Sequence, residues 1–327
     1  MCNRNCHNQK NALLILTSQS MLTAAAARIR NREYAKYRID GIALLDGDHV
    51  GEQIEGIRII ANGDTVINYI CRQWVDEVLI DLPSDERIED RLLETILLMG
   101  VTVHIRGADE KELTMCRYPL SRRQELCKRA LDVAGSMVGC LCTVFLTLIL
   151  SPIIFLKSPG PVFFSQIRIG KNGRRFKMYK FRSMYVDAEE RKQELMDQNL
   201  VKGGYMFKIK HDPRIIGGDH GIGSFIRRYS IDEFPQFWNV LRGDMSLVGT
   251  RPPTPDEWER YEPHHRVRLA MKPGITGMWQ VSGRNDVTDF EEVVKLDTEY
   301  ISNWSMWTDI KILVKTLFVI FWKRGAM

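Results

Sequence analysis

The chain has 327 residues, of which 44% are hydrophobic and 27% are charged. This is the composition of a folded protein long enough for two domains, and it excludes a chain that is disordered throughout. Residues 1–120 hold 14 Lys or Arg and 18 Asp or Glu, whereas residues 121–327 hold 32 and 23, so the net charge changes from −4 to +9. The second half is therefore expected to meet an anion, with nucleic acid, lipid headgroups and nucleotide phosphates as candidates.

The N-terminus and the cysteines favour a cytoplasmic location. The seven cysteines form neither a CxxC pair nor a regular disulfide framework, which is typical of reduced thiols. Cys2, Cys6 and His7 have no second ligand pair at zinc spacing, so a loose tail is the preferred interpretation. The chain does not open with the charged and apolar regions of a secretory signal.

Residues 11–110 alternate short apolar runs with helical patterns. Strands are expected at 13–16, 39–45, 75–80 and 101–105, and helices near 20–33, 63–73 and 84–99. Strands that alternate with helices of this length predict βαβ units and a parallel sheet. The fold class is therefore α/β, and a Rossmann-like domain is expected within residues 1–120.

The turn after the first expected strand has no glycine. Leu16 is followed by Thr17, Ser18, Gln19 and Ser20, where a dinucleotide site requires a glycine-rich loop. A regulatory or assembly role is favoured for this domain, and nucleotide binding is the weaker alternative.

A charge-free segment of twenty-four residues, 133–156, is long enough to reach across a hydrocarbon core. Ser151 and Pro152 interrupt it, and basic residues flank both of its ends. Pro152 is expected to kink a helix. A re-entrant helix that enters the membrane and turns back is preferred over a spanning helix and over a buried core helix.

The segment 310–322 alternates Ile, Leu, Val and Phe with Lys311 and Lys315, and it follows Trp304 and Trp307. This pattern is typical of a helix at a membrane interface. A helix that packs on the protein's own core would show the same periodicity.

Basic, glycine-containing clusters between residues 160 and 290 predict loops around one anionic site, because a diphosphate needs guanidinium and ammonium donors. Solvated basic surface is the alternative for each cluster alone. The clusters are 166–173, 180–184 and 272–277.

The central motif of this region is 227–235, in which Asp232 and Glu233 follow two arginines. A carboxylate can attack phosphorus and hold a phospho-sugar covalently when cations neutralise the phosphate oxygens. The structural alternative is a capping box from Ser230 to Glu233, with Pro235 at a helix start. The two interpretations are compatible, because a helix N-terminus also suits an anion.

Several motifs occur together and in order, and with them residues 121–327 resemble the bacterial sugar transferase family of monotopic polyprenyl-phosphate phosphoglycosyl transferases. Longer members carry a similar Rossmann-like domain, usually after four transmembrane helices, so the chain is interpreted as a short natural variant or a truncation. The motifs are Lys128-Arg129-x-x-Asp132, Ser151-Pro152, 180–184, 230–236 and 243–249.

The resemblance implies a mostly helical (α+β) catalytic domain at 121–327 with a re-entrant membrane helix at about 133–156. It implies Asp232 as nucleophile and Mg²⁺ contact, with Glu233 assisting. The residues expected to bind substrate phosphates are Arg227, Lys180, Arg182, Arg251 and Arg284. Gly274, Gln280 and Arg284 belong to the family's later Pro-Gly-x-Thr-Gly segment.

The implied reaction transfers a hexose 1-phosphate from a UDP-sugar to undecaprenyl phosphate, with release of UMP and an aspartyl intermediate. Such a step initiates exopolysaccharide, capsule or O-antigen synthesis. The resemblance implies a monotopic protein on the cytoplasmic face of the inner membrane, with lipid, donor and acceptor as partners, no nucleic acid, and a homodimer left open. A membrane scaffold and a nucleotide-sugar oxidoreductase or dehydratase are the rival functions. The sequence does not select the sugar.

Overall fold

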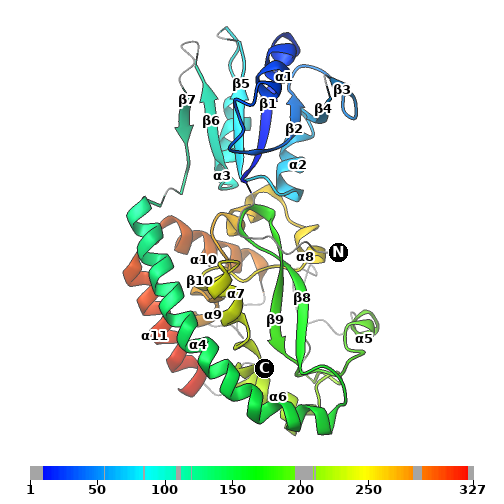
Figure 1. Ribbon diagram of the computed structural model, residues 1–327, viewed down its shortest axis with the longest axis vertical. Helices are drawn as coiled ribbons and strands as arrows, with labels where there is room; N and C mark the ends of the chain where they lie inside the picture. Colours follow the sequence, from blue (N-terminus) through cyan, green and yellow to red (C-terminus); the bar gives the residue numbers. More distant parts are fainter. Residues whose placement is uncertain are drawn as a thin grey trace. The chain divides into compact units, whose positions relative to one another are not determined.

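A computed structural model describes residues 10–54, 56–83, 85–107, 112–118, 120–195, 209, 211–282 and 289–322 of the protein (Figure 1). The chain divides into two compact units. The first consists of Met1–Pro119, Asn172–Arg174 and Tyr261–Ala270, and the second of Leu120–Lys171, Arg175–Arg260 and Met271–Met327. Two short segments from the second half of the sequence therefore belong to the N-terminal unit, a feature that the sequence analysis missed.

The first unit contains a mixed, mainly parallel sheet with the strand order β3-β4-β2-β1-β5-β6-β7. β1 pairs in parallel with β2 and β5, β2 with β4, and β5 with β6, whereas β3 and β7 are antiparallel edge strands. The predicted parallel sheet is confirmed, although β3, β4 and β7 were missed. The strands are β1 (Ala12–Thr17), β2 (Arg38–Leu44), β3 (Gln53–Ile54), β4 (Ile57–Asn62), β5 (Glu77–Asp81), β6 (Thr102–Arg106) and β7 (Glu112–Met115).

Three helices of the first unit lie where the sequence predicted them. They are α1 (Leu22–Arg30), α2 (Val66–Arg72) and α3 (Asp90–Leu98). All six residues of β1 are buried, as expected for a central strand covered on both faces.

The segment Tyr261–Ala270 contributes a buried arginine to the first unit. Arg266 is fully buried, and its guanidinium donates to the carbonyl oxygens of Val75 at 3.0 Å and of Met99 and Asn172 at 3.4 Å. Burial lowers the pKa of Arg266 to about 10. One side chain of the 3₁₀ helix η8 (Pro263–Leu269) thus joins three separate chain segments within this unit.

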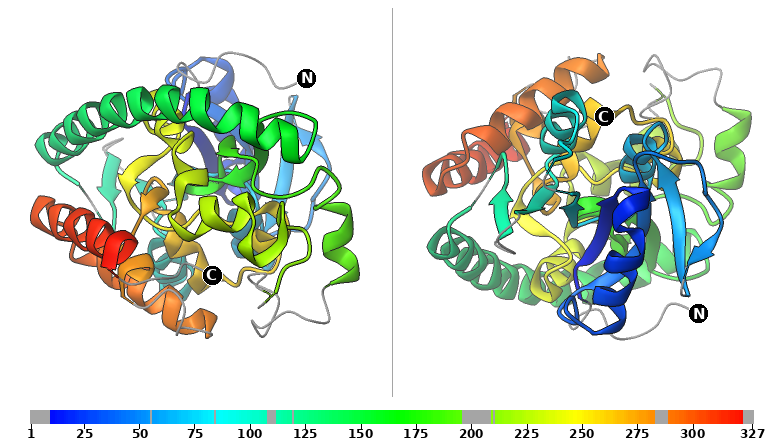
Figure 2. Two further views of the ribbon diagram at one scale, coloured as in Figure 1. Left: turned by 90° about the horizontal axis from the view of Figure 1, so that it is seen from below. Right: turned by 90° about the horizontal axis from the view of Figure 1, so that it is seen from above.

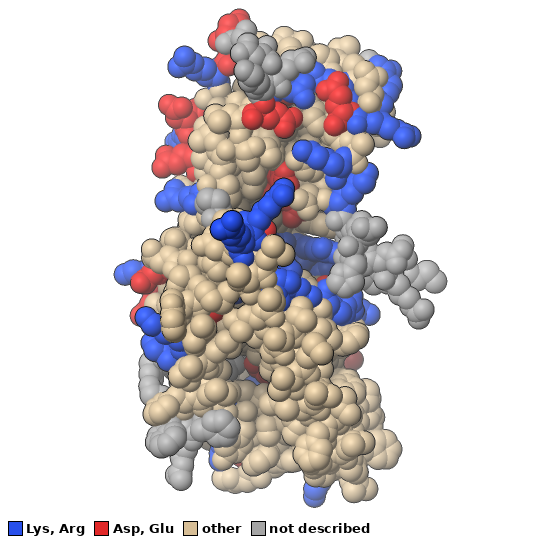
Figure 3. All heavy atoms as spheres, turned by 60° about the vertical axis from the view of Figure 1, so that its left-hand side comes forward, with Lys and Arg blue, Asp and Glu red and all other residues tan. Residues whose placement is uncertain are grey.

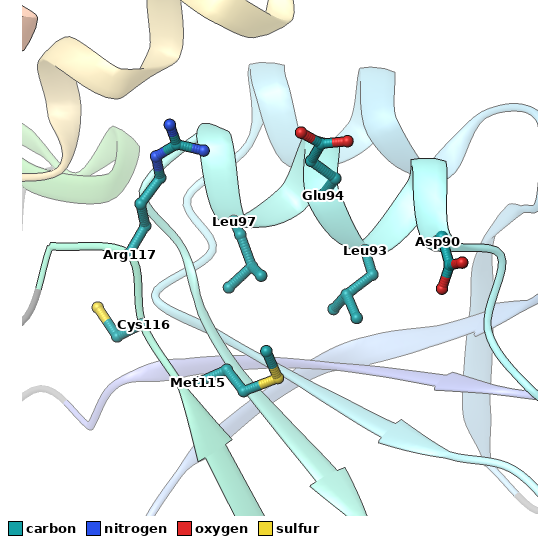
Figure 4. A pocket seen from close by; sticks show the side chains of 7 residues that line it. All are labelled: Asp90, Leu93, Glu94, Leu97, Met115, Cys116 and Arg117. Atoms are coloured by element: carbon teal, nitrogen blue, oxygen red, sulfur yellow. The ribbon is translucent and has the colours of Figure 1, made fainter.

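A small pocket of about 270 Å³ opens between α3 and the end of β7 (Figure 4). Its floor is apolar, and none of the residues expected to bind phosphate lines it. The lining residues are Asp90, Leu93, Glu94, Leu97, Met115, Cys116 and Arg117.

The second unit combines two short two-stranded sheets with many helices. β8 (Phe163–Ile169) and β9 (Arg175–Phe181) form an antiparallel hairpin, and β10 (Ser246–Val248) pairs in parallel with β11 (Gly274–Thr276). The expectation of a mostly helical α+β unit is in keeping with these elements. The helices are α4 (Arg122–Lys157), α5 (Glu190–Glu194), α6 (Ile222–Arg228), α7 (Gln236–Arg242), α8 (Pro255–Trp258), α9 (Met278–Val281), α10 (Phe290–Ser302) and α11 (Met306–Trp322).

The charge-free segment lies in the long helix α4. A capping box between Ser121 and Gln124 starts the helix, and it continues through Pro152 to Lys157. Ser151 and Pro152 therefore do not end the helix, although the ribbon changes direction near the end that contains them (Figures 1 and 2). A proline inside a helix removes one hydrogen bond and accounts for such a change of direction.

One face of α4 packs on the second unit, and the opposite face is exposed and apolar. Among the described residues, α4 is the one helix long and apolar enough to cross a membrane, and little of its apolar window is buried. A broad surface with almost no charged atoms is visible in the lower part of Figure 3. The exposed side chains are Leu126, Met137, Val138, Leu141, Val144, Phe145, Leu148, Ile149, Ile153, Phe155 and Leu156.

The C-terminal segment is helical, as predicted, and forms α11. This helix also exposes apolar residues, namely Trp307, Ile310, Val314, Leu317 and Phe318, whereas Trp304 just before it is buried. α11 therefore presents an exposed apolar face.

Candidate active site

The two adjacent acids Asp232 and Glu233 lie in a 3₁₀ turn, η7 (Ile231–Glu233), between α6 and α7. The predicted capping box is wrong, because Ser230 is left-handed with φ 52° and its side chain makes no cap bond. A capping residue needs extended backbone, which the sharp turn out of α6 does not allow here. Pro235 does mark a helix start, since α7 begins at the next residue.

Lys180 on β9 connects the two acids. Its Nζ lies 3.5 Å from Asp232 Oδ2 and 3.2 Å from Glu233 Oε1. Asp232 is buried and Glu233 is half-buried. The fold thus brings together a basic and an acidic motif that are about fifty residues apart in the sequence. A carboxylate oxygen in this position can act as a nucleophile or as an oxygen ligand for a cation.

Arg227 is in the last turn of α6, five residues before Asp232, and it is half-buried. Its guanidinium has no hydrogen-bond or ion-pair partner among the described residues, in contrast to the other arginines of the site. Burial raises the pKa of the Asp212 carboxyl, but hydrogen bonds and charge from Arg214 and the charge of Arg227 outweigh burial. The pKa of Asp212 is therefore lowered. Arg227 is thus placed to offer donors to an anion.

Arg251 is held by a buried carboxylate that the sequence analysis did not identify. Its Nη1 and Nη2 lie 3.0 Å and 3.1 Å from the two oxygens of Glu257, a bidentate arrangement. Although burial raises it, the pKa of Glu257 is lowered, chiefly by Arg251 and then by Arg168. Glu257 also accepts from the backbone N–H of Thr254, so it orients the arginine and starts α8.

Arg168 on β8 belongs to the same cluster, and the basic run 166–173 alone predicted no separate role for it. Its Nη1 lies 3.8 Å from Glu257 Oε2 and donates to the Pro252 carbonyl at 3.0 Å. Burial and then the charge of Arg251 lower its pKa to about 10, while Glu257, Glu189 and Glu233 oppose that shift.

Arg182 binds backbone carbonyl oxygens just after α4. It is buried, and its guanidinium donates to the carbonyl oxygens of Ser158 and, at 3.5 Å, of Pro159, just after α4. Arg182 therefore holds the end of α4 in the structure, and its phosphate-binding role stays a prediction. Arg284 lies outside the described residues.

The glycines of the expected phosphate loops serve close backbone packing. A Cβ atom on Gly274 would lie 2.1 Å from the backbone N of Gly249, and one on Gly277 would lie 2.1 Å from the Gly249 carbonyl oxygen. Such distances leave no room for a side chain at either glycine. The two glycines therefore allow the close approach of β11 and the segment that follows it to Gly249 after β10. The side chain of Gln280 lies beside Gly277, and phosphate binding by this segment stays a prediction.

The motif Lys128-Arg129-x-x-Asp132 holds α4 against its neighbours. Lys128 is buried and its Nζ lies 2.5 Å from Asp309 Oδ2 on α11. Arg129 donates to carbonyl oxygens at the end of α7, and Asp132 accepts from Ser246 and from the backbone N–H of Leu247 at the start of β10. Of the basic residues before the apolar run, Lys128 and Arg129 thus make tertiary contacts, whereas Arg122 and Arg123 are exposed.

Comparison with known proteins decides the family. The profile described as "Bacterial sugar transferase" matches residues 123–323, more than half of the chain. The chain belongs to the bacterial sugar transferase family. Asp232, Glu233, Lys180 and the arginine cluster all lie within the matched region, and this assignment agrees with the resemblance inferred from the motifs.

Three relatives of this family carry informative names. The galactosyl transferase CpsE of Streptococcus agalactiae is 45% identical over 83% of this chain and 63% of its own length. The undecaprenyl-phosphate galactose phosphotransferase of Salmonella typhimurium is 42% identical over 63% of this chain and 42% of its own length. The exopolysaccharide production protein ExoY of Rhizobium meliloti is 37% identical over 62% of this chain and 88% of its own length. The chain thus spans less than two thirds of the first two relatives.

Proposed function

We propose that this protein transfers a sugar 1-phosphate from a UDP-sugar to undecaprenyl phosphate at the cytoplasmic face of the bacterial inner membrane. The observation that carries the proposal is the contact of Lys180 with both Asp232 and Glu233, inside the region that matches the sugar transferase family. The names of the relatives support an undecaprenyl-phosphate acceptor and a role in the synthesis of exopolysaccharide.

In the proposed first step, a carboxylate oxygen of Asp232 attacks the β-phosphorus of the UDP-sugar. The bond from that phosphorus to the bridging oxygen breaks, and UMP leaves with the electron pair. In the second step an oxygen of undecaprenyl phosphate attacks the same phosphorus and releases Asp232. Lys180 and Arg227 are placed to neutralise phosphate oxygens, which lowers the barrier to attack by an anion.

The donor set suits Mg²⁺. Asp232 and Glu233 offer adjacent carboxylate oxygens, the ligand type that this hard cation prefers. A bound Mg²⁺ would supply charge neutralisation to the diphosphate of the donor. Lys180 already offsets one of the two carboxylate charges, so a bound Mg²⁺ would leave a net positive charge to face the diphosphate.

The packing of α4 favours a helix with one face in the lipid over a spanning helix. Near its N-terminus Lys128 is bound to Asp309, and near its C-terminus Ile154 belongs to a core cluster with Phe181 and Ile226. Because both ends pack on the same unit, the helix cannot cross a bilayer without leaving that unit. We therefore propose a monotopic, re-entrant attachment through the exposed face of α4, with α11 in the interface.

Product formation by wild-type protein and by Asp232→Asn tests the function. Asn keeps the volume of the side chain and removes the nucleophilic charge, so the rate should fall by on the order of 10⁴-fold. The assay measures UMP release and radiolabelled lipid product from a panel of UDP-sugars with Mg²⁺ and undecaprenyl phosphate.

The matched control is Asp64→Asn, which makes the same charge change at an exposed position of the first unit. It should retain wild-type activity. Release of UMP without acceptor, in an amount equal to the enzyme, would support the covalent step. Undiminished product from Asp232→Asn would refute the assignment of the nucleophile, and absence of product with every donor would favour the scaffold function.

A further inference from the structure

One face of the β8–β9 hairpin connects the acids of the candidate site with the arginine cluster. Lys180, which contacts both acids, lies directly opposite Phe164 in the regular register between the two strands. Residues that lie opposite each other in an antiparallel pair share a face, and alternate residues of one strand share it too. Gln166 therefore lies on the face of Lys180, about 7 Å further along the strand, and Arg168 follows at the same spacing.

The far end of this face is cationic. The guanidinium of Arg168 lies 3.8 Å from Glu257, the carboxylate that holds Arg251 by two hydrogen bonds. It also donates to the carbonyl oxygen of Pro252 at 3.0 Å, so β8 is tied to the segment that carries Arg251. Because two guanidiniums share this one carboxylate, a phosphate is favourable here, whereas a hexose carries no charge. The nucleotide half of the donor is therefore expected on this side of Lys180.

Gln166 lies between Lys180 and this cationic end, and its side chain has a fixed orientation. Arg168 Nη2 donates to Gln166 Oε1 at 2.8 Å. Because a guanidinium offers only donors, the oxygen of the carboxamide must face it, and the NH₂ group is directed elsewhere. Gln166 is half-buried, and its Nε2 makes no hydrogen bond to the residues that the structure describes. Its carboxamide thus presents a donor beside an acceptor that still has one lone pair.

We propose that Gln166 binds the uracil base of the donor, and that Arg168 is the positioning residue that orients its carboxamide. This inference rests on the proposed function and deepens it. The edge of uracil offers the donor N3–H between the acceptors O2 and O4. A carboxamide oxygen and its neighbouring NH₂ group match one donor and one acceptor of that edge, as amide side chains do when they recognise bases in nucleic acids.

Gln166→Met tests the inference, because Met keeps the length of the side chain and removes both polar atoms. When a reaction proceeds through a covalent intermediate, the kcat/KM of each substrate reports the half-reaction in which that substrate takes part. The uracil has left with UMP before the acceptor reacts. The kcat/KM of the UDP-sugar should therefore fall by about tenfold or more, the effect of two lost hydrogen bonds, while that of undecaprenyl phosphate stays within about twofold.

UMP and ribose 5-phosphate, which lacks the base, are compared as inhibitors of each variant. For Gln166→Met the inhibition constant of UMP should rise about tenfold, whereas that of ribose 5-phosphate should stay within about twofold of wild type. Gln53→Met makes the same change at an exposed position of β3 and is the matched control, which should alter neither constant.

The role of Arg168 is tested by Arg168→Lys, since an ammonium cannot reproduce the fixed fork that bonds Gln166 and Pro252 together. It should lower the ratio by which UMP inhibits better than ribose 5-phosphate. Because Arg168 acts through Gln166, the double variant Gln166→Met/Arg168→Lys should show the same ratio as Gln166→Met alone. A ratio that falls further in the double variant would overturn the positioning role.

An equal fall of both kcat/KM values, or an unchanged inhibition constant of UMP, would overturn the assignment of Gln166. A general defect in folding predicts the equal fall, because it lowers the amount of active enzyme in both half-reactions. Contact of Gln166 with the hexose predicts unchanged inhibition by UMP and an altered preference between UDP-galactose and UDP-glucose. A wild-type protein that releases no UMP with any donor would instead overturn the proposed function, so the wild-type protein alone distinguishes the two failures.

Discussion

Loss of one partner from the buried ion pair between Lys128 and Asp309 is expected to destabilise the second unit strongly. Lys128 Nζ lies 2.5 Å from Asp309 Oδ2, 3.0 Å from the Val248 carbonyl oxygen and 3.4 Å from Tyr300 Oη. The two charged side chains are 9% and 1% exposed, so water screens the pair little. Lys128→Met would remove the cation and leave a buried carboxylate.

The expected cost follows from what remains around Asp309. Removal of one partner from a buried pair typically costs about 3–5 kcal/mol. Asp309 would still accept from Tyr300 Oη at 2.7 Å and from Trp304 Nε1 at 3.2 Å, which favours the lower end, about 3 kcal/mol. For a unit of this size each kcal/mol lowers Tm by about 2–4 °C, so Tm should fall by about 10 °C.

Thermal unfolding in detergent at one fixed scan rate measures the effect. Lys157→Met, at the exposed end of the same helix, is the control and should change Tm little. Lys128→Met/Asp309→Asn should recover more than half of the loss, because the neutral amide oxygen still accepts from Tyr300 and Trp304. A fall of less than about 2 °C for Lys128→Met, or a double variant as unstable as the single one, would refute the argument.

Two further predictions concern pH and the membrane. Although burial raises it, hydrogen bonds from His104, Asn11 and Tyr37 lower the pKa of Glu77 to about 2. The folded pKa lies below the unfolded value of 4.5, so the ionised Glu77 stabilises the folded state by about 3 kcal/mol. This stabilisation is fully present above pH 4.5 and is lost as pH falls toward 2. Denaturant titrations at several pH values should show the free energy of unfolding falling between pH 4.5 and pH 2 in wild type, and falling less in Glu77→Gln. An equal fall in both proteins would contradict the prediction. Leu148→Lys on the exposed face of α4 should reduce the fraction of protein that co-sediments with vesicles, since a charge in the hydrocarbon costs about 3 kcal/mol. The control Gln53→Lys, at an exposed position of the first unit, should leave the co-sedimenting fraction unchanged. Undiminished sedimentation of Leu148→Lys would argue against lipid contact by this face.

Local patterns were sufficient for most elements of the first unit. The continuous apolar runs of β1 and β5 predicted buried strands, because central parallel strands are covered on both faces. β4 was missed although Ile57, Ile59 and Ile60 form a short apolar run between Gly56 and Gly63, a signal that was present in the sequence. The edge strand β7 has mostly exposed residues, so its pairing with β6 depends on position in the sheet and not on a local pattern.

The candidate site was predictable in residue type but not in pairing. The motifs pointed to Asp232, Glu233 and Lys180, and the fold does bring them together. The same basic pattern also included Arg182, whose partners are backbone carbonyls after α4, and Arg251, whose partner is Glu257. Whether an arginine meets a carbonyl, a carboxylate or a substrate depends on tertiary neighbours, which spacing along the chain does not encode.

The assignment of Tyr261–Ala270 to the first unit has a consequence for biosynthesis. About 140 residues, among them the apolar helix α4, separate Pro119 from the segment that supplies Arg266 to Val75 and Met99. At typical ribosomal rates the nascent N-terminal unit waits roughly 10–30 s for this segment. During that interval the sheet has emerged from the ribosome without its buried arginine, while α4 can already reach the bilayer. Completion of the N-terminal unit therefore follows the synthesis of α4.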